Sequence, residues 1–408
     1  MSKLDELIKK LCPDGVEYKR LGEIGTGFYR GSGIKRDDIT PDGIPCVRYG
    51  EIYTTYHVAF SRCISHTQSQ NLSKSKFFSH GDILFAITGE SVADIAKSCA
   101  YLGNEDCLAG GDILVMKHEQ NPKYIAYALE TNDARKQKSK GKIKSKVVHA
   151  SVQSIKDIVI PVPPLEVQSE IVKILDNFTE LTTELTMELT TELTARKKQY
   201  EYYRNRLLTF ESKDISLFKL QDVVEIQRGI RVTRNQLSND GKYPVYQNSL
   251  VPMGYYNDKN REANSTFLIC AGAAGDIGYS TQAFWAADDC YTFDCSDKIL
   301  NRYLFYVLKN KQALIYSKVR RASVPRISKE SVGTIKVPVP EISVQERIVN
   351  VLDNFDKVCN DLHIGLPAEI EARKKQYEFY RDSLLTFLEK GESILTDRQT
   401  DRQTDRQN

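Results

Sequence analysis

The chain has 408 residues, of which 41% are hydrophobic and 27% charged, with a formal net charge of +3. This composition is ordinary for a soluble protein of two or three domains, and any strongly basic surface must be local. There is no apolar run near the ~18 residues of a membrane span, no secretory h-region at the start, and no CxxC pair among nine cysteines. These absences argue against a membrane protein, a disulfide framework and a zinc site, so reduced thiols in the cytoplasm are expected.

The first residues resemble a segment near the middle of the chain. Residues 3–24 predict a short helix, a turn at Pro13-Asp14-Gly15 and a strand. Pairing Leu21 with Leu220 aligns this stretch with residues 206–223 at an offset of 199. The N-terminus would then supply the piece that follows the central helix, and the repeat would be circularly permuted, with the last helix closing back on the first residues.

Two regions of dissimilar sequence, about 25–157 and 224–334, each alternate short apolar runs with Gly, Pro, Asn and Ser. Such runs predict strands. The clearest are 44–52, 82–88, 113–117, 243–247, 266–270 and 290–294. A helix is predicted after the strands of each region, over 122–130 and 301–310. Each region therefore reads as a strand-rich, mixed α/β domain.

A segment of about fifty residues occurs twice, 177 residues apart. ARKKQYEYYRNRLLTF begins at Ala195 and ARKKQYEFYRDSLLTF at Ala372, and the same offset aligns two LDNF and two PVP motifs. Two copies are too few for a solenoid, and they fit two halves related by a pseudo-two-fold axis.

Each copy predicts a long helix after a proline-rich entry. Apolar residues recur at steps of three and four, and residues 165–210 as one helix would span roughly 70 Å at ~1.5 Å per residue. Such a stripe needs a partner helix, and the second copy is the candidate. The residues expected to pack helix against helix, or to dock a partner protein, are Tyr200, Tyr203, Leu207, Phe210, Tyr377, Tyr380, Leu384 and Phe387.

The two copies differ after LDNF. The first continues with TELTTELTMELTTEL, whose four-residue period lets helix length change by about one turn while the stripe is kept. The second carries Gly365 and Pro367, which predict an interruption with a restart at Ala368.

Basic residues gather just before each proline-rich entry. Residues 134–156 and 311–329 contain no acidic residue. A single charge run is usually a solvated loop, but two runs at matched places favour phosphate contact. Candidate contacts from these runs are Lys138, Lys140, Lys142, Lys144, Lys146, Lys318, Arg320, Arg321 and Arg326. Further candidates, several able to pair with base edges, are Arg30, Lys35, Arg36, Arg48, Tyr49, Arg62, Arg228, Arg231, Arg234, Gln247, Asn248, Tyr255 and Tyr256.

No catalytic or metal-binding constellation is found in the sequence. There is no GxxxxGK[ST] loop and no kinase or hydrolase motif. Pro13-Asp14 followed by Glu17-Tyr18-Lys19 mimics a nuclease signature, but a turn explains it better. The glycine-rich stretch 272–278 is expected to form a tight strand–loop turn, with phosphate or DNA-backbone contact as the alternative.

The two dissimilar domains, each followed by PVP, LDNF, ARKKQYE(Y/F)YR and LLTF, together with the TEL tetrads, resemble the specificity subunit of type I restriction–modification enzymes. The resemblance implies an α+β fold, in which two mixed α/β target recognition domains are separated by long helices that form an antiparallel coiled coil. It implies a recognition domain over 1–158 (with a partial repeat in 1–24), a central helix over 159–211, a second recognition domain over 212–335 and a distal helix over 336–390. Residues 391–408, which include the TDRQ repeats, are expected to be a disordered tail.

By the same resemblance, each recognition domain reads one half of a split target in double-stranded DNA, and the helices dock two methyltransferase subunits, which restriction–translocase subunits join. The chain would have no catalytic site, metal or cofactor of its own, and S-adenosylmethionine, ATP and Mg²⁺ would bind the partners. One alternative is a coiled-coil scaffold with two protein-binding domains, which leaves the matched basic runs unexplained. Another is a self-sufficient DNA methyltransferase or nuclease, which needs motifs that are not found.

Overall fold

The computed structural model describes residues 2–68, 76–140, 147–210, 215–238, 240–361 and 363–386. The predicted TDRQ tail lies outside these ranges. The chain divides into two compact units. Unit 1 is Met1–Thr186 with the described residues from Ala372 onward, and unit 2 is Met187–Glu371. In the described part of the chain, no helix is both long enough and apolar enough to cross a membrane.

Unit 1 contains two five-stranded sheets. The first has the order β2 (Gly25–Arg30), β12 (Ile113–His118), β8 (Ile83–Ala86), β10 (Ser98–Tyr101) and β5 (Ala59–Phe60). The second has the order β3 (Ile39–Thr40), β6 (Ser65–Thr67), β4 (Ile44–Val47), β11 (Cys107–Ala109) and β7 (Phe77–Phe78). Two short ladders complete the strands, β1 (Tyr18–Arg20) with β14 (Val159–Pro161) and β9 (Thr88–Gly89) with β13 (Val148–His149).

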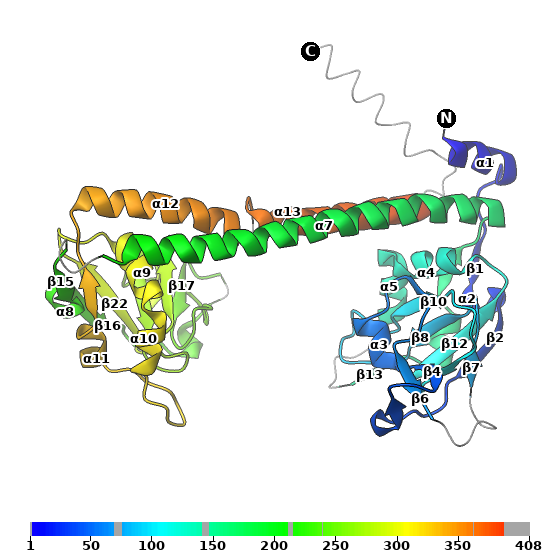
Figure 1. Ribbon diagram of the computed structural model, residues 1–408, viewed down its shortest axis with the longest axis horizontal. Helices are drawn as coiled ribbons and strands as arrows, with labels where there is room; N and C mark the ends of the chain where they lie inside the picture. The colour runs from blue at the N-terminus through cyan, green and yellow to red at the C-terminus, as the bar shows by residue number, and fades with distance from the viewer. Residues whose placement is uncertain are drawn as a thin grey trace, which may run out of the picture. The chain divides into compact units, whose positions relative to one another are not determined.

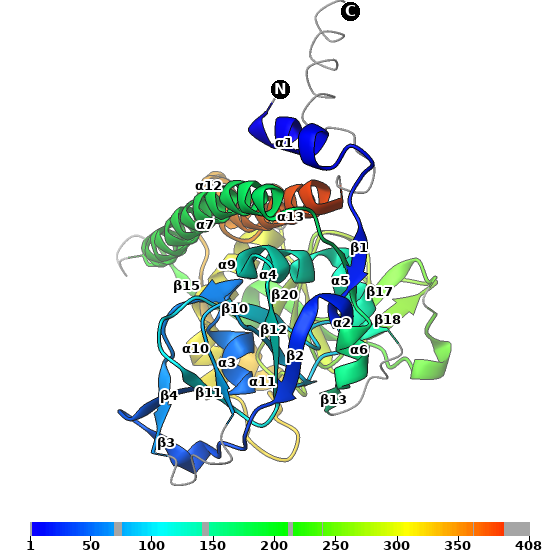
Figure 2. The same ribbon diagram turned by 90° about the vertical axis from the view of Figure 1, so that its right-hand side faces the viewer.

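The described part of unit 1 has six helices before the long helix. They are α1 (Lys3–Leu11), α2 (Leu21–Ile24), α3 (Tyr49–Thr54), α4 (Pro122–Glu130), α5 (Asn132–Ser139) and α6 (Val152–Lys156). Of these, α4 packs against β10 and β8, and α3 packs against β8. In Figure 1, α4 and α5 lie between the strands of this unit and the long helix α7 (Leu165–Leu208). Figure 2 faces this unit and shows α1 and β1, in blue, leading into α2 and β2.

Unit 2 has a four-stranded sheet with the order β16 (Val224–Arg228), β22 (Cys290–Cys295), β19 (Ser265–Ile269) and β20 (Ile277–Ser280). A three-stranded sheet has the order β18 (Gly254–Tyr256), β17 (Tyr243–Tyr246) and β21 (Trp285–Ala286), and β15 (Leu217–Lys219) pairs with β23 (Lys336–Pro338). The helices are α8 (Leu220–Val223), α9 (Asn301–Asn310), α10 (Gln312–Ser317), α11 (Lys329–Gly333), α12 (Ile342–Asn360) and the start of α13 (Leu366–Thr386).

One strand prediction is wrong in its second half. Residues 44–52 were expected to form a strand, but β4 ends at Val47 and α3 begins at Tyr49. The reason is a local cap, because the Glu51 carboxylate accepts a hydrogen bond from the Arg48 backbone N–H at 3.0 Å. A side chain that caps the first turn favours a helix over an extended strand.

The weak alignment at the N-terminus is confirmed by strand pairing. β1 pairs antiparallel with β14, Tyr18 facing Pro161, and β15 pairs in the same way with β23, Leu217 facing Pro338. The residue that follows β1 or β15 donates its backbone N–H to a carbonyl at the equivalent place. In unit 1, Leu21 donates to the Ile158 carbonyl at 2.8 Å. Unit 1 therefore begins with the same piece that follows α7 in unit 2.

A buried glutamine fixes each strand-rich domain to its helix. Gln168 and Gln345 are both 0% exposed. Gln168 donates to the Pro163 carbonyl at 2.7 Å and accepts from the Asn121 N–H at 3.0 Å. Gln345 makes the equivalent bonds, to Pro340 at 2.8 Å and from Leu300 at 2.9 Å. Buried backbone groups must be paired, so these side chains close the turn before each long helix.

The aspartate of each LDNF motif makes a second anchor. Asp176 accepts from the Tyr127 hydroxyl at 2.9 Å and pairs with the Lys123 ammonium at 2.7 Å. Asp353 accepts from the Tyr306 hydroxyl at 2.5 Å and pairs with Arg302 at 2.7 Å. The repeated motif thus holds the α4 or α9 helix of each domain against its long helix.

Helix-on-helix packing occurs in both units. In unit 1, the Phe178 ring stacks on Tyr380 with centroids 5.9 Å apart, and the Thr179 and Tyr377 hydroxyls are 2.9 Å apart. In unit 2, Tyr203 stacks on Phe355 at 5.4 Å. Phe178 contacts Tyr380 and the next residue, Thr179, contacts Tyr377, which comes earlier on α13, so these helices are antiparallel, as the resemblance implied.

The predicted interruption of the distal helix is confirmed, with an earlier restart. α12 ends at Asn360 and α13 begins at Leu366, two residues before the expected Ala368. A Cβ on Gly365 would lie 2.5 Å from the Lys357 carbonyl oxygen, so the turn requires glycine. Pro367 is accommodated because N–H groups of a first helical turn have no intrahelical acceptor.

Candidate nucleic-acid interface

In unit 1, three of the predicted contact residues come together. Arg36, Arg48 and Tyr49 line a hollow of about 480 Å³, which the loop Gly110-Gly111-Asp112 also lines. Arg30, at the end of β2, reaches Asp112 with an N···O distance of 3.7 Å. Lys35 and Arg62 are exposed but do not line this hollow.

Arg48 is held in place by a buried acid. Its Nε donates to Glu51 Oε1 at 3.1 Å, and Ser65 donates to the same oxygen at 2.5 Å. Glu51 is 5% exposed, whereas the Arg48 side chain remains 35% exposed. An ion pair of this kind restricts the rotamers of the arginine while its outer nitrogens can still reach a ligand.

A polar chain beside this hollow was missed by the sequence analysis. The Thr88 hydroxyl donates to Asp112 at 3.1 Å and lies 3.1 Å from Nδ1 of His149. The pairing of β9 with β13 brings His149 to Thr88 across 61 residues of sequence. No local motif signals such a pairing, and only the ladder reveals it.

The first basic run is divided by burial. Lys138 is 5% exposed and its ammonium donates to the Ser98 hydroxyl at 3.2 Å, so the structure does not present it to a DNA phosphate. Lys140 is exposed, and Lys142, Lys144 and Lys146 lie outside the described residues. The prediction for Lys138 is therefore corrected.

The environment of Lys138 is unusual for a lysine. Burial lowers its pKa to about 8, although the nearby Glu130 carboxylate opposes the shift. Burial alone would raise the pKa of Glu130, but Lys138 and Arg135 together hold it below its usual value. Arg135 bonds Glu130 at 2.8 Å and also lies 3.6 Å from Glu378 on α13. This cluster ties α5 to the domain and to the distal helix.

In unit 2, the predicted residues lie around the ends of β16 and β17. Arg228 donates from Nε to the Asp288 carbonyl at 2.8 Å, and Gln247 Nε2 lies 3.4 Å from Asp289 Oδ2. Tyr256 packs against Trp285 with centroids 5.0 Å apart. The remaining predicted residues are exposed: Arg231, Arg234, Asn248 and Tyr255.

The second basic run forms a folded loop. Arg320 and Arg326 exchange two backbone hydrogen bonds, at 2.8 and 3.1 Å, and the Gly272 N–H donates to the Pro325 carbonyl at 3.1 Å. The predicted contacts in this run are all exposed: Lys318, Arg320, Arg321 and Arg326. Gly272 and Gly275 have φ of +85° and +94°, and the stretch joins β19 to β20, so it is a tight turn as expected.

Comparison with known proteins bears on this arrangement. Residues 13–195 and 212–372 match the family model for the type I restriction modification DNA specificity domain. The chain belongs to this family. Among the described residues of this specificity chain, no group of three or more His, Cys, Asp or Glu side chains is placed to hold a metal ion.

Curated relatives of the specificity chain agree in name. A Mycoplasma pneumoniae chain assigned as a type I specificity subunit is 32% identical over 247 residues, 57% of this chain and 98% of that one. The specificity subunit of the type I restriction enzyme EcoR124I/EcoR124II from Escherichia coli is 33% identical over 262 residues, 57% of this chain and 64% of that one.

Solved structures show the same fold. A chain from a study of complex assembly and conformational transition in a type I restriction–modification system matches with a TM-score of 0.67 and 16% identity, over 92% of this chain and 98% of that one. The specificity subunit of M. genitalium matches with a TM-score of 0.51 and 16% identity, over 91% and 96%.

The stripe residues expected to pack or dock are mostly packed. Tyr200, Leu207 and Phe210 contact the core of unit 2, and Leu384 contacts the core of unit 1. Tyr203, Tyr377 and Tyr380 make the helix contacts given above, while Phe387 lies outside the described residues. Their neighbours Tyr202 and Phe379 are exposed, at 57% and 62%, and occupy equivalent positions of the repeat.

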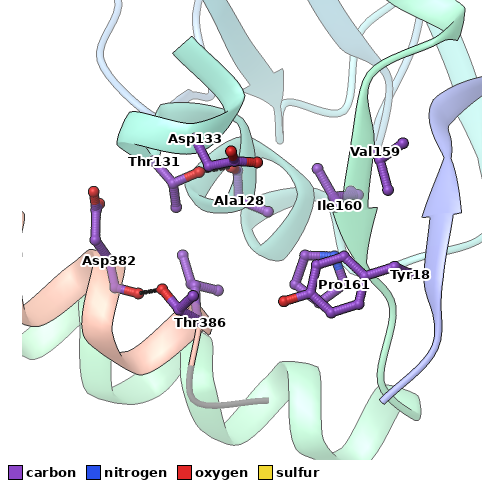
Figure 3. Close-up of a pocket in the computed structure, with 10 residues that line it drawn as sticks. Tyr18, Ala128, Thr131, Asp133, Val159, Ile160, Pro161, Asp382 and Thr386 are labelled. Atoms are coloured by element: carbon purple, nitrogen blue, oxygen red, sulfur yellow. Dashed lines mark hydrogen bonds between the residues drawn. The ribbon is translucent and has the colours of Figure 1, made fainter. Parts of the chain in front are cut away.

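A hollow of about 270 Å³ marks the seam between α13 and the rest of unit 1 (Figure 3). Asp382 and Thr386 line it from the helix, and Thr131 and Pro161 face them from the domain. The Asp382 carboxylate accepts the Asn132 N–H at 2.9 Å. The hollow therefore belongs to the packing of α13 against the recognition domain of unit 1.

Proposed function

We propose that this chain is the DNA-recognition subunit of a type I restriction–modification complex, in which each unit reads one half of a split target. The observation that carries this proposal is the repeated anchor. Equivalent glutamines and aspartates hold two domains of different sequence on the same helix motif. Two domains that recognise different DNA sequences independently require a common helical scaffold and different exposed surfaces.

The character of the exposed residues supports DNA as the ligand. Arg36, Arg48 and Tyr49 line one hollow in unit 1, and an exposed basic loop containing Arg320 and Arg326 belongs to unit 2. Arginine binds both phosphates and base edges, so these surfaces can both position a duplex and read it. We also propose that the chain acts in the cytoplasm, where it would meet this DNA.

We further propose that two methyltransferase subunits dock on the repeated helices, and that restriction–translocase subunits join them. Tyr202 and Phe379 support this, because large exposed aromatic residues at equivalent repeat positions are suited to equivalent protein contacts. Catalysis, with its S-adenosylmethionine, ATP and Mg²⁺, would then belong to the partners, and this chain would supply none of it.

Binding across a salt series tests the proposal. The complex of this chain with methyltransferase subunits is titrated into a duplex carrying the mapped target and into a scrambled duplex. We expect tighter binding to the target, with affinity for both duplexes falling steeply as salt rises. Equal and salt-insensitive binding would instead favour a protein-binding scaffold. Turnover by the purified chain alone with S-adenosylmethionine or Mg²⁺ would contradict the non-catalytic assignment.

A further inference from the structure

The two recognition domains differ in sequence but share a backbone arrangement at the exit of the first strand of their main sheets, β2 and β16. At the exit of β2, the Gly31 N–H donates to Ile113 at 2.9 Å, and a Cβ on Gly31 would lie 2.1 Å from the Gly110 carbonyl oxygen. At the exit of β16, the Gly229 N–H donates to Cys290 at 3.0 Å, and a Cβ would lie 2.1 Å from the Ala287 carbonyl oxygen. Both crossings require glycine.

The loop that faces each glycine is also held in the same way. The Gly110 N–H donates to the Val47 carbonyl and the Ala287 N–H to the Tyr246 carbonyl, both at 2.9 Å. These bonds make the residues that follow, Arg48 and Gln247, structurally equivalent. The equivalence rests on backbone hydrogen bonds and does not depend on sequence similarity, which is slight here.

We call this arrangement, the crossing glycine (Gly31 or Gly229) with the loop that faces it, the recognition frame. Four residues next to it can be compared between the two units. One position holds the same residue, Arg30 in unit 1 and Arg228 in unit 2, and both arginines contact the facing loop of their own domain. A second also matches, Asp112 and Asp289. The other two differ, because Arg48-Tyr49 in unit 1 is replaced by Gln247-Asn248 in unit 2. Different side chains at solvent-accessible positions of a common frame are suited to reading different bases.

Arg48 has the attributes of a base reader. Its Nε is bonded to Glu51, which is buried, so the terminal pair Nη1 and Nη2 is the fork that can bind a ligand. That fork matches O6 and N7 of guanine in the major groove. Gln247, at the equivalent position, carries the amide donor and acceptor that match N7 and N6 of adenine.

We propose that Arg48 reads a guanine in one half of the target and Gln247 an adenine at the equivalent place of the other half. This rests on the proposed function and adds the residues and bases to it. Arg30 and Arg228 are positioning residues, common to both halves because the frame is common. The competing structural reading is that Arg48 only caps α3. That cap uses the Arg48 backbone N–H, which any residue except proline provides.

Binding-site selection with the assembled complex tests the proposal, using Arg48→Gln, Arg48→Lys, Gln247→Arg and the control Arg62→Gln. For Arg48→Gln, discrimination for guanine should fall at one position of one half by roughly 5- to 150-fold, the value of one bidentate pair. Arg48→Lys should keep most of the affinity but lose part of the discrimination. Gln247→Arg should raise the preference for guanine in the other half only.

The control and the contrary outcomes separate this inference from the proposed function. Arg62 is a predicted DNA contact that is exposed outside the hollow, so Arg62→Gln should leave the guanine preference unchanged, with any loss of affinity equal for all sequences. If Arg48→Gln leaves the guanine preference unchanged, or changes the preferred bases in both halves of the target, the assignment of Arg48 is wrong. The proposed function would still stand in that case, provided that the wild-type complex selects its target. If Arg48→Gln does not fold, Gln247→Arg decides alone, and an unchanged second half overturns the inference. A wild-type complex without sequence preference refutes the function itself.

Discussion

Replacing the buried lysine of the first basic run by methionine should stabilise the protein and leave DNA binding intact. Lys138 is 5% exposed and bonds Ser98, whereas Lys140, two residues on, is exposed. Methionine fills a similar volume and needs no partner for a charge. Lys138→Met and Lys140→Gln therefore form a matched pair that separates a buried charge from a surface charge.

The magnitude follows from the pKa of Lys138, which burial lowers from its usual 10.5 to about 8. At ~1.4 kcal/mol per pKa unit, a charged Lys138 costs the folded state about 3 kcal/mol. Losing the bond to Ser98 removes about 1 kcal/mol, so a net gain of about 2 kcal/mol is expected. Glu130 keeps a partner in the variant, since Arg135 still bonds it at 2.8 Å.

The gain should depend on pH in a defined direction. Between about pH 8 and 10.5 the unfolded chain holds more protons at Lys138 than the folded chain does, so its contribution to the free energy of unfolding rises with pH. The advantage of Lys138→Met should be full below pH 8 and should vanish toward pH 10.5.

Urea unfolding of both variants and the wild type at pH 7 and pH 10 measures this effect, and DNA titrations across salt measure binding. Lys140→Gln should leave stability unchanged and reduce the salt slope by about one phosphate contact. A loss of stability at pH 7 in Lys138→Met, or a loss of DNA affinity as large as that of Lys140→Gln, would refute the reasoning.

Other changes should have equally specific effects. Gln345→Ala should cost about 3 kcal/mol in urea unfolding, because three backbone hydrogen bonds are lost where water has little access; a cost below 1 kcal/mol would contradict the anchor. Deleting the tetrad 186–189 shortens α7 by roughly 6 Å at ~1.5 Å per residue. The unread spacer of the target should then shorten by one or at most two base pairs of ~3.4 Å. One pair is the preferred outcome, because four residues turn a helix ~40° beyond a full turn, close to the ~35° twist of one base-pair step, and methylation mapping would show it. Tyr202→Ser and Phe379→Ser should each weaken methyltransferase association in sedimentation experiments without changing the bases read, and unchanged association in both would exclude this surface.

The helical scaffold could be predicted from sequence because the repeat carries long-range information. The offset of 177 predicted that Asp176 and Asp353 are equivalent, and the structure gives them equivalent tyrosine partners. The periodic stripe predicted α7 closely. The interruption at Gly365 was predicted from glycine and proline chemistry, although its length was not.

The candidate site was predictable in composition but not in arrangement. The density of charge along the sequence predicted basic surfaces, but it does not show which side chains are buried. The Lys138 side chain is buried and lines a pocket together with Glu130. Residues 49–52 appeared suitable for a strand because the sequence does not show that Glu51 turns back to cap Arg48. Asp112 and His149 both reach the Thr88 hydroxyl from distant segments of the chain, and no motif in either segment indicates this.

Exchange of one recognition domain tests the central claim most directly. Residues 25–157 are replaced by the corresponding region of a relative with a different target, and the methylated sites of the assembled complex are mapped. The account predicts that one half of the target changes while the other half stays as in the wild type. A change in both halves, or an active complex with neither half altered, would contradict the claim that two domains on a repeated helical scaffold recognise DNA independently.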